Sequence, residues 1–368
     1  MKLFCSGTDL SDAVFTVIAA LPQRKNISIL EGIKLEAYGD ELKVTATDLE
    51  LTIEKKIKAD IKIEGEVVVA GKIFTDFIKK LSNEQVELDG TASDRIKVKY
   101  GDSKCEFACL PKEEYPATRV IDNTLSFSLF QKDLKDLITK TAFSVAQDDS
   151  RMILKGCLFE LNENVLTVVA LDGYRLAMAV KPLECNNIDN SKLIIPSRSL
   201  NEIKKILNDD NELVTVYIQN NFIMTEIKNT RITTQLIDGE YISYRNIIPV
   251  SFLTEVIIAK EQFNECLERA SVISRIGKNN LVKLDVKEKV LTILSDSEEG
   301  NIDEKLPVKF TGQELQIAFN AKYLTDCMGA IEDEYIKLSF NNSKTPCVIT
   351  PIETNNYLYL ILPVRVQG

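Results

Sequence analysis

Apolar residues recur along this chain with two periods that alternate from one segment to the next. In the segment 129–146 they follow at steps of three and four, with Leu134, Leu137 and Ile138 on one side, which predicts an amphipathic helix. In "LFELNENVLTVVALDGYRLAMAV" apolar and polar residues alternate, and the turn residues 162–164 interrupt them, which predicts an antiparallel hairpin. The pattern therefore predicts an α+β fold in which helices pack on antiparallel sheets.

Three strand-like runs, "VTATDLEL", "VVALDGYRL" and "LTILSDSEEG", show that the chain repeats itself. They place Asp48, Asp172 and Asp296 at equal spacings of 124 residues. Helix-like segments recur in the same order: 9–21, 129–146 and 258–274, and then 69–81, 195–207 and 319–331. Self-similarity at a fixed period indicates repeated structural units. We therefore expect three domains, each with two helices on an antiparallel sheet, at residues 1–122, 123–250 and 251–368.

The charge is distributed unevenly over these units. The net charge is −10, yet the segment 72–81 carries three lysines against one aspartate. The segment 197–208 carries Arg198, Lys204 and Lys205 against Glu202. The net charge argues against a protein coated in basic surface for nucleic acid. If each helix buries one face on its sheet, however, the opposite faces form one basic surface across the three units while strands and loops hold the acid. For any one helix, the alternative is an ordinary solvated face.

The absence of certain residues and motifs removes most enzyme classes. The chain has no histidine, so it cannot build a Ser-His-Asp or Cys-His nucleophile or an H-E-x-x-H zinc site. It has neither a phosphate-binding loop of the G-x-x-x-x-G-K-[ST] type nor a G-x-G-x-x-G dinucleotide motif. The eight cysteines include no C-x-x-C pair, so we expect no zinc site and no disulfide framework. We expect no cofactor.

Two other function classes stay open at this point. Acidic clusters at Asp148-Asp149, Asp209-Asp210 and 332–334 leave room for a Mg²⁺-dependent phosphoesterase, although the turn-like residues that flank all three favour solvated loops. A scaffold of repeats that binds no nucleic acid is the second alternative. No apolar run reaches the roughly 18 residues of a membrane span, and the first residues lack a signal-peptide core, so we expect a cytoplasmic protein.

Four motifs, in order and spaced over the whole chain, resemble those of the bacterial DNA polymerase III beta subunit family, the DNA sliding clamps. "LDGYRLA" (171–177) is similar to T-D-G-[HY]-R-L-A, and "DGEYISYRNIIP" (238–249) to [DE]-G-x-[FY]-P-x-[YF]-x-x-[LIV]-[LIV]-P. "FACLPKEEYP" (107–116) resembles the first-domain counterpart, and "LILPVRVQG" (360–368) the M-P-[MVI]-R terminus. The chain departs from the family at Leu171, where threonine is usual, at Ile242, where proline is usual, and in the extra Gln367-Gly368.

The resemblance implies a non-catalytic processivity factor. Two copies would join head to tail into a ring whose helices line a channel around double-stranded DNA, with the sheets outside. Diffuse contacts from lysine and arginine to phosphate suit sliding, because they are weak and independent of base sequence. Such a protein would be cytoplasmic and associated with the nucleoid during replication. The candidates for phosphate contacts, termed the basic set, are Arg24, Lys79, Lys80, Gln147, Arg151, Arg198, Lys204, Lys205, Arg275, Lys278 and Lys322.

The resemblance also implies a pocket for short peptides of the DNA polymerase III alpha subunit, the clamp loader, other polymerases and repair proteins. Its aliphatic members would accept apolar anchors, and Arg175 would shape the wall by packing its stem and donating to carbonyls. A simpler alternative makes Asp172-Gly173 an ordinary hairpin turn and Arg175 a surface cap. The pocket residues, termed the docking set, are Leu154, Leu171, Gly173, Tyr174, Arg175, Leu176, Ile242, Asn246, Ile247, Pro346, Leu362, Pro363, Val364 and Arg365.

Two apolar runs are candidates for the dimer interface. Val272 and Ile273 lie at the end of the third unit's first helix, and Cys105 and Phe107 lie in the first unit. Neither run has an evident place in the core of its own unit. We therefore expect the first run of one copy to face the second run of its partner.

Overall fold

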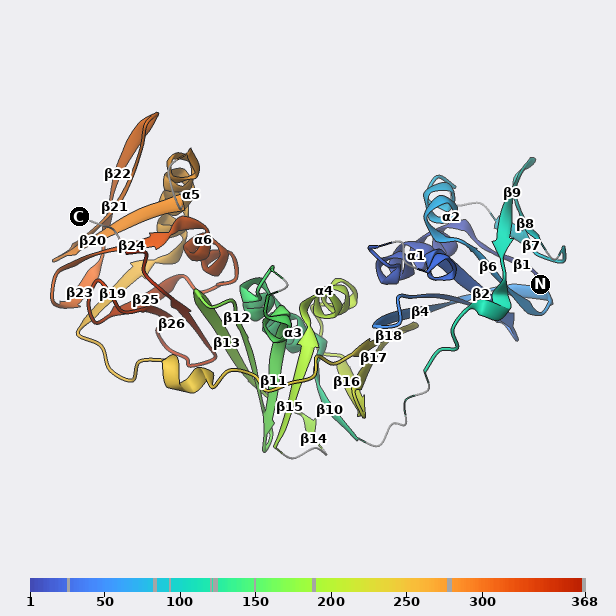
Figure 1. The fold of residues 1–368 in the computed structure, drawn as a ribbon, viewed down its shortest axis with the longest axis horizontal. Coiled ribbons are helices and arrows are strands. Elements are labelled where there is room, and N and C mark those ends of the chain that lie inside the picture. Colours follow the sequence, from blue (N-terminus) through green and yellow to red (C-terminus); the bar gives the residue numbers. More distant parts are fainter. Residues whose placement is uncertain are drawn as a thin grey trace. The chain divides into compact units, whose positions relative to one another are not determined.

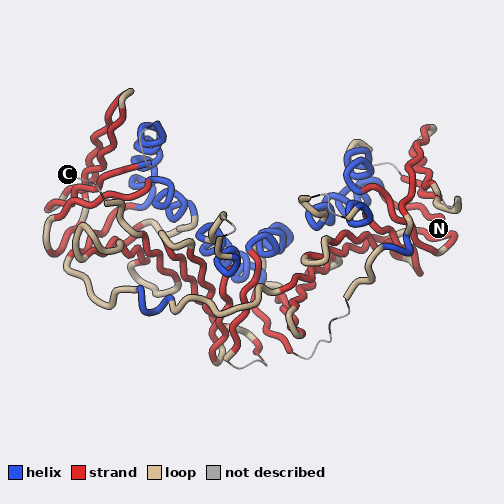
Figure 2. Tube along the Cα trace, viewed as in Figure 1, coloured by secondary structure: helices blue, strands red, loops and turns tan. Residues whose placement is uncertain are grey.

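The computed structural model describes residues 1–24, 27–81, 85–92, 94–119, 121, 125–148, 150–186, 190–276 and 280–365. The chain forms two compact units (Figure 1). The first contains residues 1–128, 205–207 and 212–236, and the second contains residues 129–204, 208–211 and 237–368. Strands predominate and helices are few (Figure 2), so the α+β class expected from the apolar periods is confirmed.

The elements follow one order three times. In the described part of the chain, a strand, a helix, five strands, a second helix and three strands form each copy, apart from short 3-10 turns. The first copy contains β1 (Lys2–Ser6), α1 (Gly7–Val17), β2 (Gly32–Tyr38), β3 (Glu41–Thr47), β4 (Leu51–Lys58), β5 (Asp60–Ile63), β6 (Gly65–Ala70), α2 (Gly71–Ile78), β7 (Gln85–Asp89), β8 (Arg95–Tyr100) and β9 (Ser103–Leu110). The second contains β10 (Leu125–Phe130), α3 (Gln131–Thr141), β11 (Gly156–Asn162), β12 (Val165–Leu171), β13 (Arg175–Pro182), β14 (Cys185–Asn186), β15 (Ser191–Pro196), α4 (Ser197–Ile206), β16 (Leu213–Gln219), β17 (Phe222–Ile227) and β18 (Thr230–Gln235). The third contains β19 (Thr254–Ala259), α5 (Lys260–Ile276), β20 (Leu281–Lys287), β21 (Val290–Ser297), β22 (Gly300–Pro307), β23 (Lys309–Gly312), β24 (Leu315–Asn320), α6 (Ala321–Gly329), β25 (Tyr335–Phe340), β26 (Cys347–Pro351) and β27 (Tyr357–Ile361).

In the first unit, a continuous antiparallel sheet supports two neighbouring helices. Its strands follow the order β16-β17-β18-β4-β3-β2-β6-β9-β8-β7-β1-β5. Helix α1 packs on β3 and β4 and against α2. Leu10 and Val14 of α1 and Phe74 of α2 are fully buried, because apolar residues at helical spacing all face the sheet. Ser6 caps α1 by accepting a 3.3 Å hydrogen bond from the Asp9 amide.

In the second unit, strands of the second and third copies form one sheet. The order is β15-β11-β12-β13-β27-β26-β25-β19-β23, and β13 pairs with β27 from Arg175↔Ile361 to Ala179↔Tyr357. Helix α3 packs on β12 and β13, whereas α5 packs on the separate sheet β22-β21-β20-β24 and against α6. The β13–β27 pairing brings the end of the chain beside the turn at 172–174.

The three repeated aspartates lie at equivalent hairpins, β3–β4, β12–β13 and β21–β22. The Asp48 and Asp172 side chains both accept hydrogen bonds from backbone amides two and three residues later. Asp296 instead lies within β21 and pairs with Asn301, and Ser297 accepts from the Glu299 amide. The third strand therefore runs two residues further than its counterparts, to Ser297, and the side chain that accepts from the turn amide lies one position later.

Candidate functional site

The turn at 172–174 is fixed by its own residues. Asp172 Oδ1 accepts hydrogen bonds of 2.8 Å from the Tyr174 amide and 3.0 Å from the Arg175 amide. Gly173 has φ +95°, a backbone conformation that favours glycine because side chains with a Cβ rarely adopt it. The turn holds Tyr174 outward, and 62% of Tyr174 is exposed.

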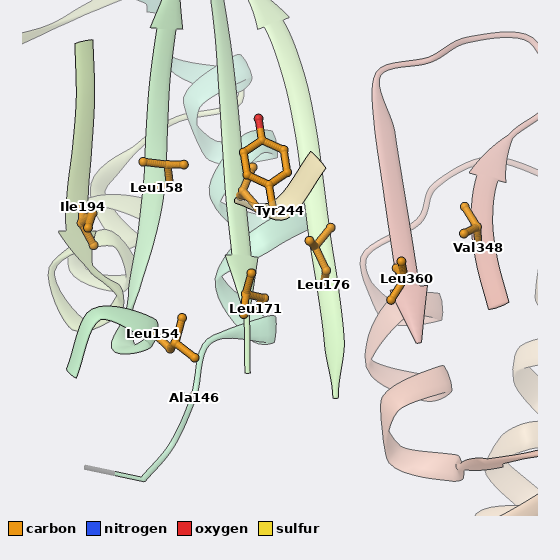
Figure 3. Packing of buried hydrophobic residues seen from close by; sticks show 10 residues of the cluster. Ala146, Leu154, Leu158, Leu171, Leu176, Ile194, Tyr244, Val348 and Leu360 are labelled. Atoms are coloured by element: carbon orange, nitrogen blue, oxygen red, sulfur yellow. The ribbon is translucent and has the colours of Figure 1, made fainter. Parts of the chain in front are cut away.

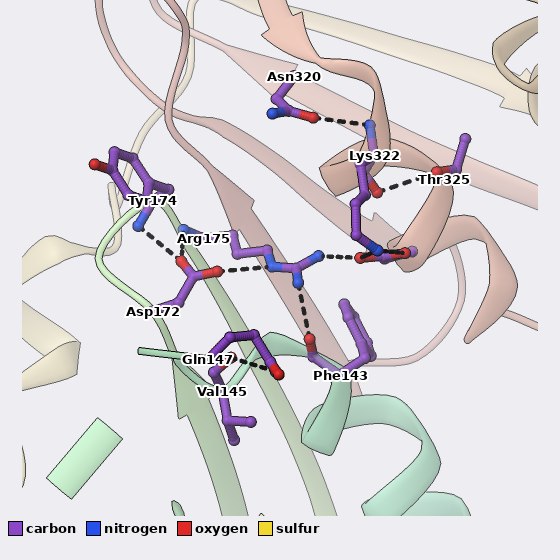
Figure 4. Close-up of polar contacts among 10 residues, drawn as sticks. Phe143, Val145, Gln147, Asp172, Tyr174, Arg175, Asn320, Lys322 and Thr325 are labelled. Carbon is purple, nitrogen blue, oxygen red and sulfur yellow. Dashed lines mark hydrogen bonds and ion pairs between the residues drawn. The ribbon is translucent and has the colours of Figure 1, made fainter. Parts of the chain in front are cut away.

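Arg175 joins three segments that are far apart in the sequence (Figure 4). Its guanidinium donates to Asp172 Oδ2 at 3.1 Å, to Asp326 Oδ2 of α6 at 2.6 Å and to the Phe143 carbonyl at 2.8 Å. The residue is only 6% exposed, so the alternative that it is a surface cap is wrong. A buried charge with this many partners stabilises one arrangement of the segments that it joins.

Helix α6 also contacts the turn through an aromatic ring. The rings of Tyr174 and Tyr323 stack with centroids 6.2 Å apart and an interplanar angle of 22°. The Arg175 guanidinium lies 4.7 Å from the centre of the Tyr323 ring. Burial, together with the negative charge of Asp172, raises the pKa of Tyr323, so this hydroxyl stays neutral at physiological pH. Asp326 is shared, because Lys322 Nζ lies 3.1 Å from both of its oxygens.

The chain end is held beside the same turn. The Leu362 amide donates to the Tyr174 carbonyl at 2.9 Å, and the Val364 amide donates to the Ala318 carbonyl at 2.8 Å. Residues that follow a terminal strand usually fray unless such bonds hold them. Leu362 itself is 38% exposed, so the tail presents an apolar side chain next to Tyr174. Gln367 and Gly368 lie outside the described residues.

The sheet that carries the turn and the tail also holds a buried apolar cluster (Figure 3). It includes Leu154, Leu171 and Leu176, which are at most 3% exposed, together with Leu360 of β27. These three members of the docking set therefore form a floor and offer little surface of their own. Leu171 fits this floor as an aliphatic residue in the place where the related motif has threonine.

The remaining members of the docking set are more accessible. Ile242, Ile247 and Leu362 are 41%, 45% and 38% exposed. Pro346, Pro363 and Val364 are half-buried, and Asn246 and Arg365 are exposed. Pro346 directly precedes Cys347, which pairs with Ile361 in the sheet, so it lies close to the tail. The structure thus places the turn, the tail and the buried floor together in the second unit.

The sequence patterns did not predict several residues that help to build this region. Phe143, Tyr323 and Asp326 contact Arg175, and Val348 and Tyr244 belong to the buried cluster. Only Asp326 had a feature in the sequence that could have indicated a role. Acidic residues occupy the equivalent positions of the other two repeats, at Asp76 and Glu202. The other four residues lie in segments where apolar residues recur regularly. Such a pattern predicts that a side chain is buried, but it does not show which residue the side chain will contact.

The described members of the basic set lie mainly on or beside helices. Arg198, Lys204 and Lys205 belong to α4, Arg275 to α5 and Lys322 to α6, while Lys79 and Lys80 follow α2. Arg24, Gln147 and Arg151 lie in exposed loops, and Lys278 lies outside the described residues. A cleft of about 470 Å³ in the second unit is lined by Gln147, Arg198 and Lys204 among others. Lys79 Nζ also lies 4.3 Å from the centre of the exposed Phe15 ring.

The four candidates for the dimer interface differ in burial. Val272 is 60% exposed, and Ile273 and Cys105 are half-buried. Phe107 is only 8% exposed and packs edge-on against Phe74 and Phe77, at 5.4 and 5.2 Å. The expectation that Phe107 lacks a place in its own unit is therefore wrong, because α2 supplies two aromatic neighbours for it.

The acidic clusters do not assemble into a metal site in the described part of the chain. No three residues among its aspartates, glutamates and cysteines are placed to hold one metal ion. Asp209 pairs with Lys135, and Asp149 lies outside the described residues. All eight cysteines are free thiols. Within the same described ranges, no helix combines the length and apolar character that crossing a membrane requires.

Comparisons with known proteins cover the whole chain. Three family descriptions match in order: "DNA polymerase III beta subunit, N-terminal domain" at residues 1–119, "central domain" at 128–242 and "C-terminal domain" at 245–365. A protein of Halalkalibacterium halodurans called "Beta sliding clamp" is 32% identical over 362 residues, which cover 95% of each chain.

Solved structures give the same result. The DNA polymerase sliding clamp from Bacillus subtilis is 30% identical, with a TM-score of 0.95 and complete coverage of both chains. A sliding clamp from Pseudomonas aeruginosa, solved bound to griselimycin, is 26% identical, with a TM-score of 0.93 and complete coverage of both chains.

Proposed function

The chain belongs to the DNA polymerase III beta subunit family, the bacterial sliding clamps, and from this premise we propose which of its residues carry each part of clamp function. The protein is a DNA sliding clamp, a non-catalytic processivity factor of the polymerase III holoenzyme. Membership of this family implies DNA, polymerase and a second copy of the chain as partners. Retention on DNA comes from ring topology, so none of these roles needs a reacting group.

The three domains are proposed at residues 1–122, 123–250 and 251–368. The threefold order of elements supports this division, and so do the three family matches at 1–119, 128–242 and 245–365. The first boundary falls among residues outside the described ranges, and the second falls just after Pro249. Sheet pairing between β13 and β27 joins the second and third domains along one edge.

The basic set is proposed to contact the phosphates of double-stranded DNA without regard to sequence. Its members on α4, α5 and α6 belong to helices whose other faces are buried, as Leu200 and Leu324 illustrate. Lysine and arginine on such faces attract phosphate weakly, which permits sliding. We place the working protein in the bacterial cytoplasm, associated with the nucleoid during replication.

The docking set is proposed to bind short peptides of the polymerase III alpha subunit, the clamp loader, other polymerases and repair proteins. The observation that carries this proposal is the bond between the Leu362 amide and the Tyr174 carbonyl, which fixes an exposed apolar tail beside an exposed tyrosine. Ile242 and Ile247 add exposed aliphatic area in the segment whose Tyr244 packs with Leu171 and Leu176 in the buried cluster. Apolar anchors of a peptide gain most when they enter such a surface.

The test is a truncation that removes the tail. Deleting residues 362–368 should leave a folded dimer whose affinity for an alpha-subunit peptide, measured by titration calorimetry, is weaker by roughly 30-fold to a thousandfold. Deleting only 366–368 is the matched control, because it keeps the bonded residues Leu362 and Val364. Thermal unfolding checks both proteins. Unaltered affinity in the folded, truncated dimer would place the docking site elsewhere.

A further inference from the structure

The segment 237–249, termed the linker, carries part of the proposed docking surface but has little structure of its own. In its described residues the only regular element is one 3-10 turn, η6 (Tyr244–Ile247). Ile242 and Ile247 are 41% and 45% exposed, so burial of their own side chains does not hold them firmly. Other contacts must keep these two side chains where a peptide would meet them.

The linker's shortest side-chain contacts converge on one residue, Glu160 of β11. The Tyr244 hydroxyl donates to Glu160 Oε2 at 2.6 Å. Arg245 donates to both carboxylate oxygens, to Oε1 at 3.1 Å and to Oε2 at 2.5 Å. Tyr241 makes only longer bonds, at 3.4 and 3.5 Å, to backbone carbonyls. Two-pronged arginine–carboxylate bonds fix orientation as well as distance.

Glu160 suits this role because it is buried yet remains charged. It is 7% exposed, and Lys192, its cross-strand neighbour on β15, adds a third partner at 3.4 Å. Burial alone would raise the pKa of this carboxyl, but the hydrogen bonds from Arg245 and Tyr244 outweigh it and lower the pKa to about 2. The carboxylate therefore stays ionised throughout the physiological range.

The position of Glu160 also relates it to the buried floor. In β11 it follows Leu158 by two residues, so both side chains lie on the same face of the sheet. Leu158 and Tyr244 belong to the cluster that includes Leu171 and Leu176. The tyrosine thus packs its ring on the floor and bonds its hydroxyl to Glu160, which attaches the linker at two points.

We propose that Glu160 is a positioning residue of the docking surface: by holding Tyr244 and Arg245, it keeps Ile242 and Ile247 in the places where they receive the apolar side chains of a partner peptide. This inference rests on the proposed docking function. Glu160 itself acts through the linker, since its carboxylate is occupied by protein donors.

The experiment measures linker order and peptide affinity separately. The chain contains no tryptophan, so Ser243→Trp supplies a single fluorophore within the linker, whose anisotropy reports its mobility. Affinity is measured without this reporter, with a fluorescein-labelled alpha-subunit peptide. Glu160→Gln removes the buried partner of the Glu160–Arg245 ion pair. Arg245→Gln removes the exposed partner, and a substitution at this exposed position should not impair folding. Glu255→Gln is the control, because it removes an ion pair with Lys337 on the same sheet.

Both test variants should lower the tryptophan anisotropy and weaken peptide binding, roughly 5- to 50-fold, with the control unchanged. Unchanged anisotropy would overturn the claim that Glu160 holds the linker. Lower anisotropy with unchanged affinity would overturn the claim that the linker's position matters for docking. If the unmodified protein binds no peptide, the proposed docking function itself fails, and the anisotropy data still show whether Glu160 orders the linker.

Discussion

At the scale of single residues, the site depends on side chains that each bind several segments. Arg175 contacts Asp172, Asp326 and the Phe143 carbonyl, and it is almost fully buried. Removing one partner of such a group leaves a buried charge unpaired, which costs more than the removal of an exposed ion pair. The turn, the 3-10 turn η4 (Ala142–Ser144), which contains Phe143, and helix α6 therefore keep one relative arrangement.

Gly173 provides the first prediction. Gly173→Ala should cost about 1–2 kcal/mol of stability, since a Cβ is strained at φ +95°, and it should also weaken peptide binding by moving Tyr174. Space is not limiting, because the nearest atom to the added Cβ is Arg151 Nη1, at 3.7 Å. Gly39→Ala is the matched control at φ +64° with nothing within 4 Å. A drop in peptide affinity in the control as large as in Gly173→Ala would contradict a specific role for this turn.

At this scale the sequence could predict only features that are formed by residues close together in the chain. The Asp172-Gly173 turn has its signal within four residues, because an aspartate that accepts from the following amides and a glycine at positive φ are both short-range features. The partner of Arg175 lies 151 residues away, at Asp326. That contact exists only because β13 pairs with β27, and strand pairing across repeats leaves no trace in local periodicity.

At the scale of elements, three copies of one order of strands and helices organise the chain. The spacing of the motifs was sufficient to predict the three copies, because corresponding elements recur at nearly equal intervals along the chain. It was not sufficient for Phe107, whose apolar neighbours Phe74 and Phe77 come from a different element of the same copy. An apolar run that lacks an obvious partner in sequence can still be core, because helix-to-sheet packing is nonlocal.

The helices provide the second prediction. Replacing Arg198, Lys204 and Lys205 of α4 with alanine should flatten the dependence of DNA binding on salt, by about 0.9 in the logarithmic slope for each phosphate that is no longer neutralised. Discrimination between DNA sequences should not change. Filter binding of duplexes at several salt concentrations measures both quantities.

The control for α4 removes three lysines from strand and turn positions, Lys287, Lys289 and Lys309. It changes the net charge by the same amount without touching the helix. Equal slopes for the two triple variants would contradict the assignment of phosphate contacts to α4.

At the scale of the whole molecule, function requires a second copy of the chain. Val272 is 60% exposed on α5, and the half-buried Ile273 follows it, so together they offer apolar area that the protein's own core does not use fully. We propose that the partner's face includes half-buried Cys105 of β9, with the nearly buried Phe107 of the same strand as its support. In a head-to-tail ring, the proposed contact between these two runs would occur twice.

The third prediction concerns this assembly. Val272→Ala combined with Ile273→Ala should weaken the dimer, because apolar burial is worth roughly 25 cal/mol per Å² and the ring contains two interfaces. Light scattering should then show monomers at nanomolar concentration. Val165→Ala, at an apolar position that is 40% exposed on β12, should leave the dimer intact. A dimer mass that persists in the double variant from micromolar to nanomolar concentration would rule out this interface.

Retention on closed and opened DNA tests the central claim most directly. The protein is assembled by a clamp loader on nicked circular DNA, washed in high salt to suppress phosphate contacts, and separated by gel filtration before and after the circle is cut once with a restriction enzyme. A ring held by topology should stay with the circle and leave the linear molecule by sliding off its ends. Equal release from both forms, or retention on the linear DNA, would contradict the account of this protein as a sliding clamp.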